Sequence, residues 1–368
     1  MDLRGRYHMA PSRRAFLKGS ALGGLGLGIL GLSPAADAQT VRRQTLPTPS
    51  AKALMEMFGL RYPIFQGPFG GPALASAMSN AGGLGHVALW NASSDAARTI
   101  VTQLRSQTKQ PFLVNYLLTF EPLSLPAALD AGAPIVHFSW GLPTAKVVAA
   151  VRQAGAKFGV QVGTAPGAQA ALELGADYLV AQGSEAGGHV QSSTPLYALL
   201  PKVLDVSKGT PVLVAGGISH GKTLRQALEA GASGALMGTR TVATQESNAH
   251  PEYKAALLRA QASDTAMSVC FQDGWPGATH RTLRNGTLVR WEAAGCPPVG
   301  NRPGEGDVVA TRQNGTTVVR YSHTPPAQGL RGTVTDLAMY AGMGVGDVRD
   351  VPTARQLVER LWAECLAG

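Results

Sequence analysis

Residues 157–189 read KFGVQVGTAPGAQAALELGADYLVAQGSEAGGH. This stretch begins with a short apolar run over residues 157–162, continues with an Ala-rich segment at helical spacing over 165–174, and returns to an apolar run over 178–181. A Gly-Ala step at 175–176 separates the helical segment from the second apolar run, as expected where a helix ends. Two buried strands joined by a helix form a βαβ unit, so the two strands are predicted to be parallel.

The same alternation continues in both directions from this stretch. Short apolar runs, typical of strands buried on both faces of a parallel sheet, occupy residues 63–65, 85–88, 112–116, 135–138, 157–162, 178–181, 211–215 and 234–237. Segments with the length and Ala/Leu content of helices follow them at 72–80, 95–106, 125–131, 145–154, 165–174, 197–206, 222–230 and 251–259. Eight such units predict an α/β protein that closes into a TIM (β/α)8 barrel.

The alternation ends near Ser268, where Gly, Pro and Arg become frequent. Two Asn-Gly pairs, Asn285-Gly286 and Asn314-Gly315, are typical of hairpin turns. The second pair lies between alternating segments at 308–311 and 317–321, which predicts a two-stranded ribbon. A smaller cap with β-hairpins is therefore expected beside the mouth of the barrel.

The first 38 residues follow the pattern of an export signal. Ser12-Arg13-Arg14-Ala15-Phe16-Leu17-Lys18 matches the twin-arginine motif, an apolar run follows over 21–32, and Ala36-Asp37-Ala38 forms a small-x-small cleavage site before Gln39. The run is shorter than the ~20 residues that span a bilayer, so no stable membrane anchor is expected. We predict recognition by the twin-arginine export machinery and a periplasmic location. This route carries folded proteins and suggests a cofactor that is inserted before export.

These patterns divide the chain into five segments. The expected organisation is a leader over residues 1–38, a linker over 39–52, the barrel over 53–268, a cap over 269–345, and a C-terminal segment over 346–368 whose helix packs on the barrel.

The composition narrows the classes of function. Of the 368 residues, 45% are hydrophobic and only 15% are charged, which excludes intrinsic disorder. The net charge is +9, and cleavage before Gln39 would lower it to +6 by removing five basic and two acidic residues. The remaining Lys and Arg residues are scattered and do not cluster with aromatic residues, so nucleic-acid binding is not expected.

The three cysteines predict neither a metal site nor a disulfide framework. Cys270, Cys296 and Cys365 are widely spaced and include no CxxC pair. Whether Cys270 pairs with Cys296 in an oxidising compartment depends on their distance, which spacing alone leaves open. The oligomeric state is open as well.

Candidate catalytic groups follow three of the predicted strands, at the end of a barrel where active sites form. A glycine-rich turn after the sixth strand leads to His189, whose side chain type is suited to moving a proton near neutral pH. Gly216-Gly217 follows the seventh strand, and Gly238-Thr239 follows the eighth. Loops at these two places often bind phosphate groups through backbone amides. A phosphorylated cofactor or substrate is the leading prediction.

From about Ala53 to the C-terminus, the chain resembles the nitronate monooxygenase family, formerly called 2-nitropropane dioxygenases. The residues that carry the resemblance are YPIFQGP at 62–68, SNAGGLG at 79–85, QGSEAGGH at 182–189, Gly216-Gly217, Gly238-Thr239-Arg240, and YAGMGVG at 340–346. The resemblance implies FMN as cofactor and His189 as the catalytic base. It further implies that FMN is contacted or surrounded by Gly67, Pro68, Phe69, Asn115, Gln182, Gly187, Gly216, Gly217, Met237, Gly238 and Thr239.

The reaction implied by the resemblance is the oxidation of a small nitronate or nitroalkane by O2 to a carbonyl compound and nitrite, with the flavin carrying the redox step. Flavin-dependent enoyl-acyl-carrier-protein reductases are close relatives, and QESNAHP at 245–251 resembles their version of that segment equally well. The alternatives are therefore an NAD(P)H-dependent FMN reductase of that type and a flavin-binding protein without turnover. Phe69 replaces the Met usual in the family, and His137 stands where the fourth-strand motif often has Ser.

Overall fold

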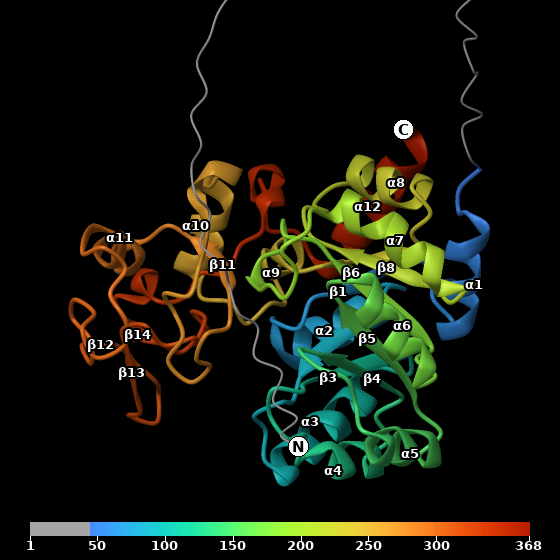
Figure 1. Cartoon of the computed structure of the whole chain (residues 1–368), viewed down its shortest axis with the longest axis horizontal. Coiled ribbons are helices and arrows are strands. Elements are labelled where there is room, and N and C mark those ends of the chain that lie inside the picture. The colour runs from blue at the N-terminus through green and yellow to red at the C-terminus, as the bar shows by residue number, and fades with distance from the viewer. Residues whose placement is uncertain (1–44) are drawn as a thin grey trace, which may run out of the picture. The chain divides into compact units, whose positions relative to one another are not determined.

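The computed structural model describes residues 45–368 (Figure 1). The export signal expected over residues 1–38 lies outside the described residues. The linker expected over residues 39–52 ends earlier than predicted, because helix α1 (Pro49–Phe58) begins at Pro49, where the Thr48 side chain accepts a hydrogen bond from the amide of Ala51. Within residues 45–368, no helix is long and apolar enough to cross a membrane.

Eight parallel strands form a single sheet that closes on itself. In chain order the strands are β1 (Ile64–Gln66), β2 (Gly85–Ala88), β3 (Phe112–Leu117), β4 (Ile135–Ser139), β5 (Lys157–Val162), β6 (Tyr178–Gln182), β8 (Val212–Ala215) and β9 (Gly234–Met237), and each end lies within one residue of its prediction. They pair in the order β1-β9-β8-β6-β5-β4-β3-β2. A parallel bridge between Phe65 and Leu84 joins the two edges. The predicted α/β barrel is confirmed.

Seven helices follow the strands as predicted, and the eighth place in the ring is taken by the predicted C-terminal helix instead of the helix expected over residues 251–259. The seven are α2 (Gly71–Asn80), α3 (Ser94–Gln107), α4 (Leu125–Asp130), α5 (Ala145–Gln153), α6 (Ala165–Glu173), α7 (Leu196–Ser207) and α8 (Gly221–Glu229). The expected eighth helix exists as α10 (Pro251–Arg259), but its buried residues Tyr253 and Leu257 pack with Met339 and Val345 of the C-terminal part. The C-terminal helix α12 (Ala354–Ala367) packs instead against α8 and α2 and completes the ring (Figure 1).

Helix α1 fills the interior of the barrel from the amino-terminal end of the strands. Helix α1 inserts Leu54 and Phe58 among inward-facing residues of the strands, including Phe65 and Tyr178, whose rings make edge contacts with Phe58. Gly159 of β5 leaves the space that the Tyr178 ring occupies, because a Cβ atom at this position would overlap that ring. The apolar filling therefore closes the amino-terminal end of the barrel and leaves the carboxyl ends of the strands for the site.

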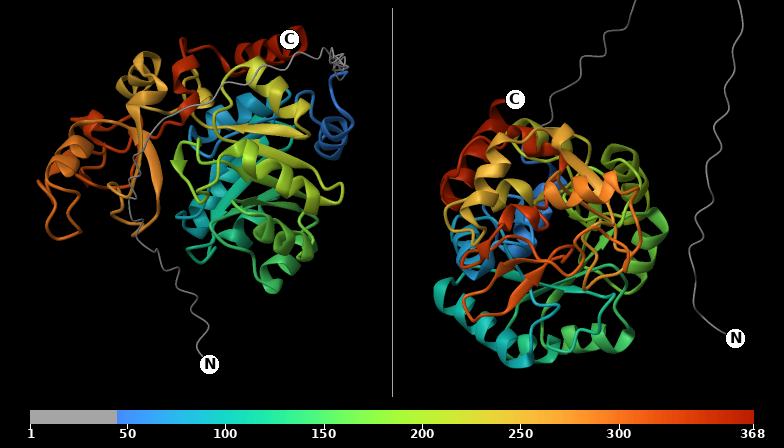
Figure 2. Two further views of the ribbon diagram at one scale, coloured as in Figure 1. Left: turned by 45° about the horizontal axis from the view of Figure 1, so that its top comes forward. Right: turned by 90° about the vertical axis from the view of Figure 1, so that its left-hand side faces the viewer.

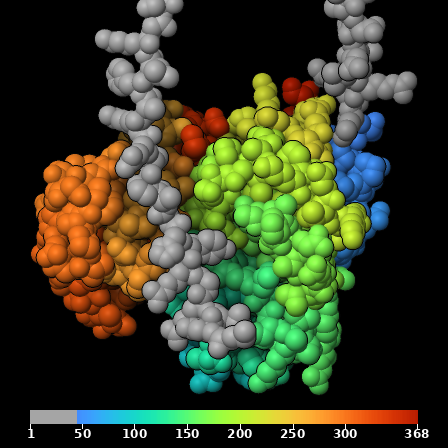
Figure 3. Space-filling model, in the orientation of Figure 1, coloured from blue at the N-terminus to red at the C-terminus, as the bar shows by residue number. Residues whose placement is uncertain are grey.

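The cap covers the carboxyl ends of the strands. Its elements are β11 (His280–Leu283), α11 (Gly286–Ala293), β12 (Val308–Thr311), β13 (Thr317–Val319), β14 (Arg331–Gly332) and 3-10 turns at Val334–Asp336 and Met343–Asp347. Between the last barrel strand and the cap lie α9 (Thr239–Val242), α10, a 3-10 turn at Ala262–Asp264 and β10 (Thr265–Ser268). Strand β11 pairs on one side with β10 and on the other with β7 (Gly188–His189), which belongs to the loop after β6. In Figures 2 and 3 the orange cap residues lie beside the barrel, whose colours run from blue through green to yellow.

The two Asn-Gly pairs behave differently. Asn314-Gly315 forms the predicted hairpin between β12 and β13. The hairpin predicted at Asn285-Gly286 is wrong: Asn285 is the N-cap of α11, and its side-chain oxygen accepts a hydrogen bond from the amide of Leu288. Asn is favoured both in turns and at helix N-caps, so the pair alone does not decide between them.

The space at Gly159 yields a first prediction. Gly159→Ala should lower the free energy of unfolding by about 2–3 kcal/mol, because the added methyl group overpacks the interior against Tyr178. Urea denaturation measures this loss. In a Tyr178→Leu background the same substitution should cost less than about 1 kcal/mol, since the smaller side chain leaves room. An equal cost in both backgrounds would contradict the assigned contact.

Candidate active site

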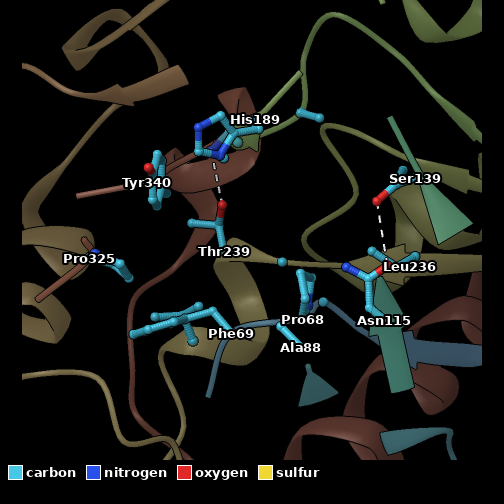
Figure 4. A pocket seen from close by; sticks show the side chains of 18 of the residues that line it. Pro68, Phe69, Ala88, Asn115, Ser139, His189, Leu236, Thr239, Pro325 and Tyr340 are labelled. Atoms are coloured by element: carbon cyan, nitrogen blue, oxygen red, sulfur yellow. Dashed lines mark hydrogen bonds between the residues drawn. The ribbon is translucent and has the colours of Figure 1, made fainter. Parts of the chain in front are cut away.

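A cavity of about 500 Å3 opens at the carboxyl ends of the strands and is walled on one side by the cap (Figure 4). This size is typical of a pocket for a small molecule. All but one of the site residues predicted from the sequence line it, namely Gly67, Pro68, Phe69, Asn115, Gln182, Gly187, His189, Gly216, Gly217, Gly238 and Thr239. Met237 is the exception: its side chain lies in the core between strands and helices, and its carbonyl oxygen accepts a hydrogen bond from the amide of Gly67.

Both the cap and the barrel hold the backbone of His189 in place. Its backbone pairs with His280 of the cap strand β11. On the barrel side, the side-chain amide of Gln182 donates to the His189 carbonyl at 3.0 Å, and its oxygen accepts from the amide of Gln191 at 2.9 Å. Gln182 therefore acts as a positioning residue for this loop. Gly187 is required there because a Cβ atom would overlap the backbone at Gly342.

The His189 imidazole lies among aromatic rings. It stacks on Trp275 with ring centroids 4.1 Å apart, and it also contacts Tyr340 at 5.3 Å and His280 at 5.5 Å. Its Nε2 atom is buried and has no hydrogen-bond partner among the described residues. Burial, together with the nearby imidazoles of His280 and His323, lowers the pKa of His189 to about 2. At neutral pH the ring is therefore neutral.

The glycine loops after β8 and β9 form a cradle of backbone beside the loop that leads to His189. Gly216 and Gly217 have φ of 121° and 72°, which favour glycine. A Cβ atom on Gly67 would lie 2.8 Å from Cα of Gly238, so the loop after β1 contacts the loop after β9. A Cβ atom on Gly238 would meet no protein atom within 4 Å, because it would point into open space. The first amides of α9 have no intrahelical partner, so this cradle suits an anionic phosphate.

Thr239 connects this cradle to the C-terminal segment. Its hydroxyl oxygen accepts a hydrogen bond from the amide of Gly342 at 2.9 Å, which leaves the hydroxyl proton free for a further bond (Figure 4). Asn115 enters from β3, where its side-chain oxygen accepts a 3.4 Å hydrogen bond from the Ser139 hydroxyl (Figure 4). Its amide group is thereby oriented at the cavity wall.

Two buried histidines form part of the cavity floor. Sequence analysis noted His137 as a departure from the family's fourth-strand motif but did not indicate His86. His86 of β2 and His137 of β4 have ring centroids 5.9 Å apart. The Nδ1 atom of His86 lies 2.9 Å from the carbonyl oxygen of Gln66, so this nitrogen carries the proton. The Nδ1 atom of His137 lies 3.2 Å from the Tyr178 hydroxyl. The Nε2 atoms of both rings are buried without a partner among the described residues.

Burial dominates the charge state of this pair. Burial lowers the pKa of His86 to about 3, against a smaller opposing effect of the bond to Gln66. Burial and the neighbouring His86 lower the pKa of His137 well below its usual value. Strand periodicity could have indicated both residues, because His86 alternates with Val87 and His137 alternates with Val136 and Phe138, which all point outward.

The fold and the site together define a βα-barrel enzyme, with a histidine after the sixth barrel strand and an amide-lined cradle after the seventh and eighth. Comparison with known families then gives a more specific assignment: the family model described as "Nitronate monooxygenase" matches residues 51–128 and 123–364. The chain belongs to the nitronate monooxygenase family, whose members are flavin-dependent oxidoreductases.

Individual relatives agree with this assignment. The nitronate monooxygenase of Pseudomonas aeruginosa is 32% identical over 358 residues, covering 83% of this chain and 97% of the relative. A solved nitroalkane oxidase from Streptomyces ansochromogenes has a TM-score of 0.70 at 28% identity and covers 86% and 98% of the two chains. FabK from Thermotoga maritima has a TM-score of 0.67 at 25% identity and covers 85% and 95%. The family thus shares its fold with enzymes of more than one name.

The buried histidines predict how stability depends on pH. His86, His137, His189 and His280 all have a pKa lowered by burial, whereas each returns to about 6.5 in the unfolded chain. Below pH 6.5 the unfolded chain binds protons that the folded chain does not. The free energy of unfolding should therefore decrease as the pH is lowered below 6.5, by up to about 1.4 kcal/mol per pH unit for each histidine. This contribution ends where the pH reaches the pKa of the folded chain, at about 4 for His280 and about 3 for His86.

His137→Ser tests this dependence. Between pH 6 and pH 5 the variant should lose stability less steeply than the parent chain, by about one proton's contribution. Urea denaturation across this range measures the slope separately from the absolute stability. Ser139→Ala, on the same strand and without a titratable group, should keep the parental slope. A parental slope in His137→Ser would show that His137 is charged in the folded chain.

Proposed function

We propose that the chain binds FMN in this cavity and oxidises nitronates, the anions of nitroalkanes, with O2 to give a carbonyl compound and nitrite. The observation that carries this proposal is that one cavity is lined both by the neutral His189 imidazole, whose Nε2 atom has no partner among the described residues, and by a glycine cradle. Among residues 45–368, the lining of this cavity includes no Asp or Glu. Such a cavity suits an anionic substrate beside an anionic cofactor phosphate.

The residues present fit FMN in two respects. The loops at Gly216, Gly217, Gly238 and Thr239 offer amides and a hydroxyl to the phosphate, and Gly238 leaves open space where any larger residue would project. The side chains of Asn115 and Phe69 line the remaining wall. FMN bound there would supply the redox chemistry between the nitronate and O2.

His189 would have different tasks with the two forms of substrate. A nitronate is already ionised, so the imidazole need only orient it and remain neutral. A neutral nitroalkane must lose a proton, which the Nε2 atom of His189 would accept, since this nitrogen has no hydrogen-bond partner among the described residues. With a pKa of about 2, the ring is a weak base until an anion forms beside it and favours the charged imidazolium. This difference supports nitronates as the better substrates.

The leader expected over residues 1–38 supports a periplasmic site of action, reached in the folded state with the cofactor already bound. This location argues against the enoyl-reductase alternative, because a carrier-bound substrate and a nicotinamide supply belong to the cytoplasm. Rapid bleaching of the flavin by NADH, with no response to nitronates, would contradict the proposed reaction.

The FMN cradle is tested by Gly238→Ala. The added methyl group meets no protein atom within 4 Å, and the backbone conformation (φ −88°) accommodates alanine, so the chain should fold with unchanged thermal stability in the absence of FMN. The methyl group would occupy space needed by the phosphate, and FMN affinity should fall at least about tenfold. Equilibrium dialysis against FMN measures the affinity. Parental affinity in this variant would place the phosphate elsewhere.

The role of His189 is tested by His189→Asn. With neutral nitroethane, kcat/KM should fall about 10²–10⁴-fold, as expected when a general base is lost. With the preformed nitronate it should fall less than about tenfold, and the flavin absorbance should remain. His250→Asn is the matched control, because His250 caps α10 outside the cavity and Asn can replace it as an N-cap. Equal losses on both substrates would remove His189 from the base role.

A further inference from the structure

Three of the five tryptophans of the chain lie together on one wall of the cavity. Trp275 is central: its ring centroid is 4.9 Å from that of Trp140 and 6.3 Å from that of Trp90. Phe120 stacks on Trp90 at 4.8 Å, on the edge of the same group. We call Trp90, Trp140 and Trp275 the tryptophan wall. Because His189 stacks on Trp275, the wall is continuous with the proposed catalytic group.

The wall is assembled from three separate parts of the chain. Trp90 follows β2, Trp140 follows β4, and Trp275 belongs to the cap segment before β11. Only closure of the cap over the barrel brings the three rings to one place. A wall built by tertiary contacts at the site, and absent from any single motif, indicates a surface that meets the substrate.

The backbone at Trp140 is held in an unfavourable conformation. Its φ of 60° lies in the left-handed region, which is a genuine outlier for a bulky residue. The side-chain oxygen of Gln191 accepts a hydrogen bond from the Trp140 amide at 2.9 Å, while the amide group of Gln191 donates to the carbonyl of Gln161. Such conformations persist where the surroundings determine them, and they cluster at functional sites. The position of this ring is therefore specified and not incidental.

The charges in the cavity lining distinguish between the two classes of ligand that an aromatic wall can bind. Aromatic rings bind either organic cations, through the negative faces of the rings, or other flat rings. Among residues 45–368, Arg312 is the only lining residue with a formal charge at neutral pH, and the histidines that line the cavity include three whose pKa is lowered by burial. A cation would meet no compensating carboxylate here. An anionic group attached to the aromatic ring would instead find one cation, Arg312, and no carboxylate in the described lining.

We propose that the substrate is an arylmethyl nitronate, in which an aromatic ring is bonded to the carbon that bears the nitro group. The ring would pack on the tryptophan wall and the nitronate would face His189. The reaction itself rests on the proposed function. The preference for an aromatic ring does not, because it is a property of binding and can be measured with compounds that do not react.

The experiment measures binding of carboxylates to the FMN-loaded protein by calorimetry and by quenching of tryptophan fluorescence. A carboxylate has the planar shape and single negative charge of a nitronate, so phenylacetate mimics the arylmethyl nitronate without reacting. Phenylacetate should bind about 5- to 10-fold more tightly than cyclohexylacetate, which has the same number of ring atoms but no π face. Benzyltrimethylammonium should bind at least about tenfold more weakly than phenylacetate.

Variants locate the preference on the wall. Trp90→Leu should bring phenylacetate and cyclohexylacetate to within about twofold of each other, and Trp90→Phe should restore most of the preference. Trp362→Leu is the matched control, because Trp362 lies on α12 beside Tyr62 and outside the cavity. Flavin absorbance and thermal unfolding check that each variant is folded and loaded.

Turnover separates the two proposals. kcat/KM for the phenylnitromethane anion should exceed that for the nitroethane anion in the parent protein, and Trp90→Leu should remove the difference. Equal binding of phenylacetate and cyclohexylacetate, or tighter binding of the cation, would overturn the aryl preference even if nitronates are oxidised. A retained phenylacetate preference without oxidation of any nitronate would instead contradict the proposed function alone.

Discussion

The side-chain amide of Gln182 joins the barrel to the loop that carries His189, and the rest of the site depends on this pair of hydrogen bonds. Gln182 ends β6, donates to the carbonyl of His189, and accepts from the amide of Gln191. Gln191 in turn holds Trp140 and reaches the carbonyl of Gln161. The side-chain amides of Gln182 and Gln191 together therefore relate the ends of β4, β5 and β6 to the position of the imidazole. Because both polar ends of each amide are occupied, the loop has a single favourable register.

Close backbone approaches fix how the cap meets the barrel. The loop before His189 lies close to the C-terminal segment. A Cβ atom on Gly187 would overlap the backbone of Gly342, and a Cβ atom on Gly342 would overlap the backbone of Gly187. The amide of Gly342 also bonds to Thr239, next to the glycine cradle. The same segment then leads to α12, which fills the eighth helix position of the barrel. Closure of the barrel and formation of the cavity are thus connected through one stretch of chain.

Periodicity predicted the barrel because it reports local burial, which a parallel strand or an amphipathic helix carries in its own residues. Periodicity could not predict which helix covers which strands, because α10 and α12 both have an apolar stripe. Only tertiary packing decides that α12 completes the ring. The hairpin predicted at Asn285-Gly286 failed because an N-cap and a turn use the same residue type. Alternation along β2 and β4 could have placed His86 and His137 on the inner face of the barrel, but it does not encode their contact with each other. The tryptophan wall likewise depends on contacts between distant strands and the cap.

The electrostatics of the cavity depend on its neutral buried histidines and on the absence of carboxylates from its described lining. His86, His137 and His189 all line this cavity, and each has a buried Nε2 atom without a partner among residues 45–368. Burial keeps the pKa of each ring well below neutrality. Within residues 45–368, no lining carboxylate compensates a positive charge there, so protonating any of these rings would leave an unpaired buried cation. A ligand that brings a negative charge supplies the missing partner. The site is therefore neutral by itself and becomes polar when an anion enters, which is the condition under which a weakly basic imidazole gains affinity for a proton.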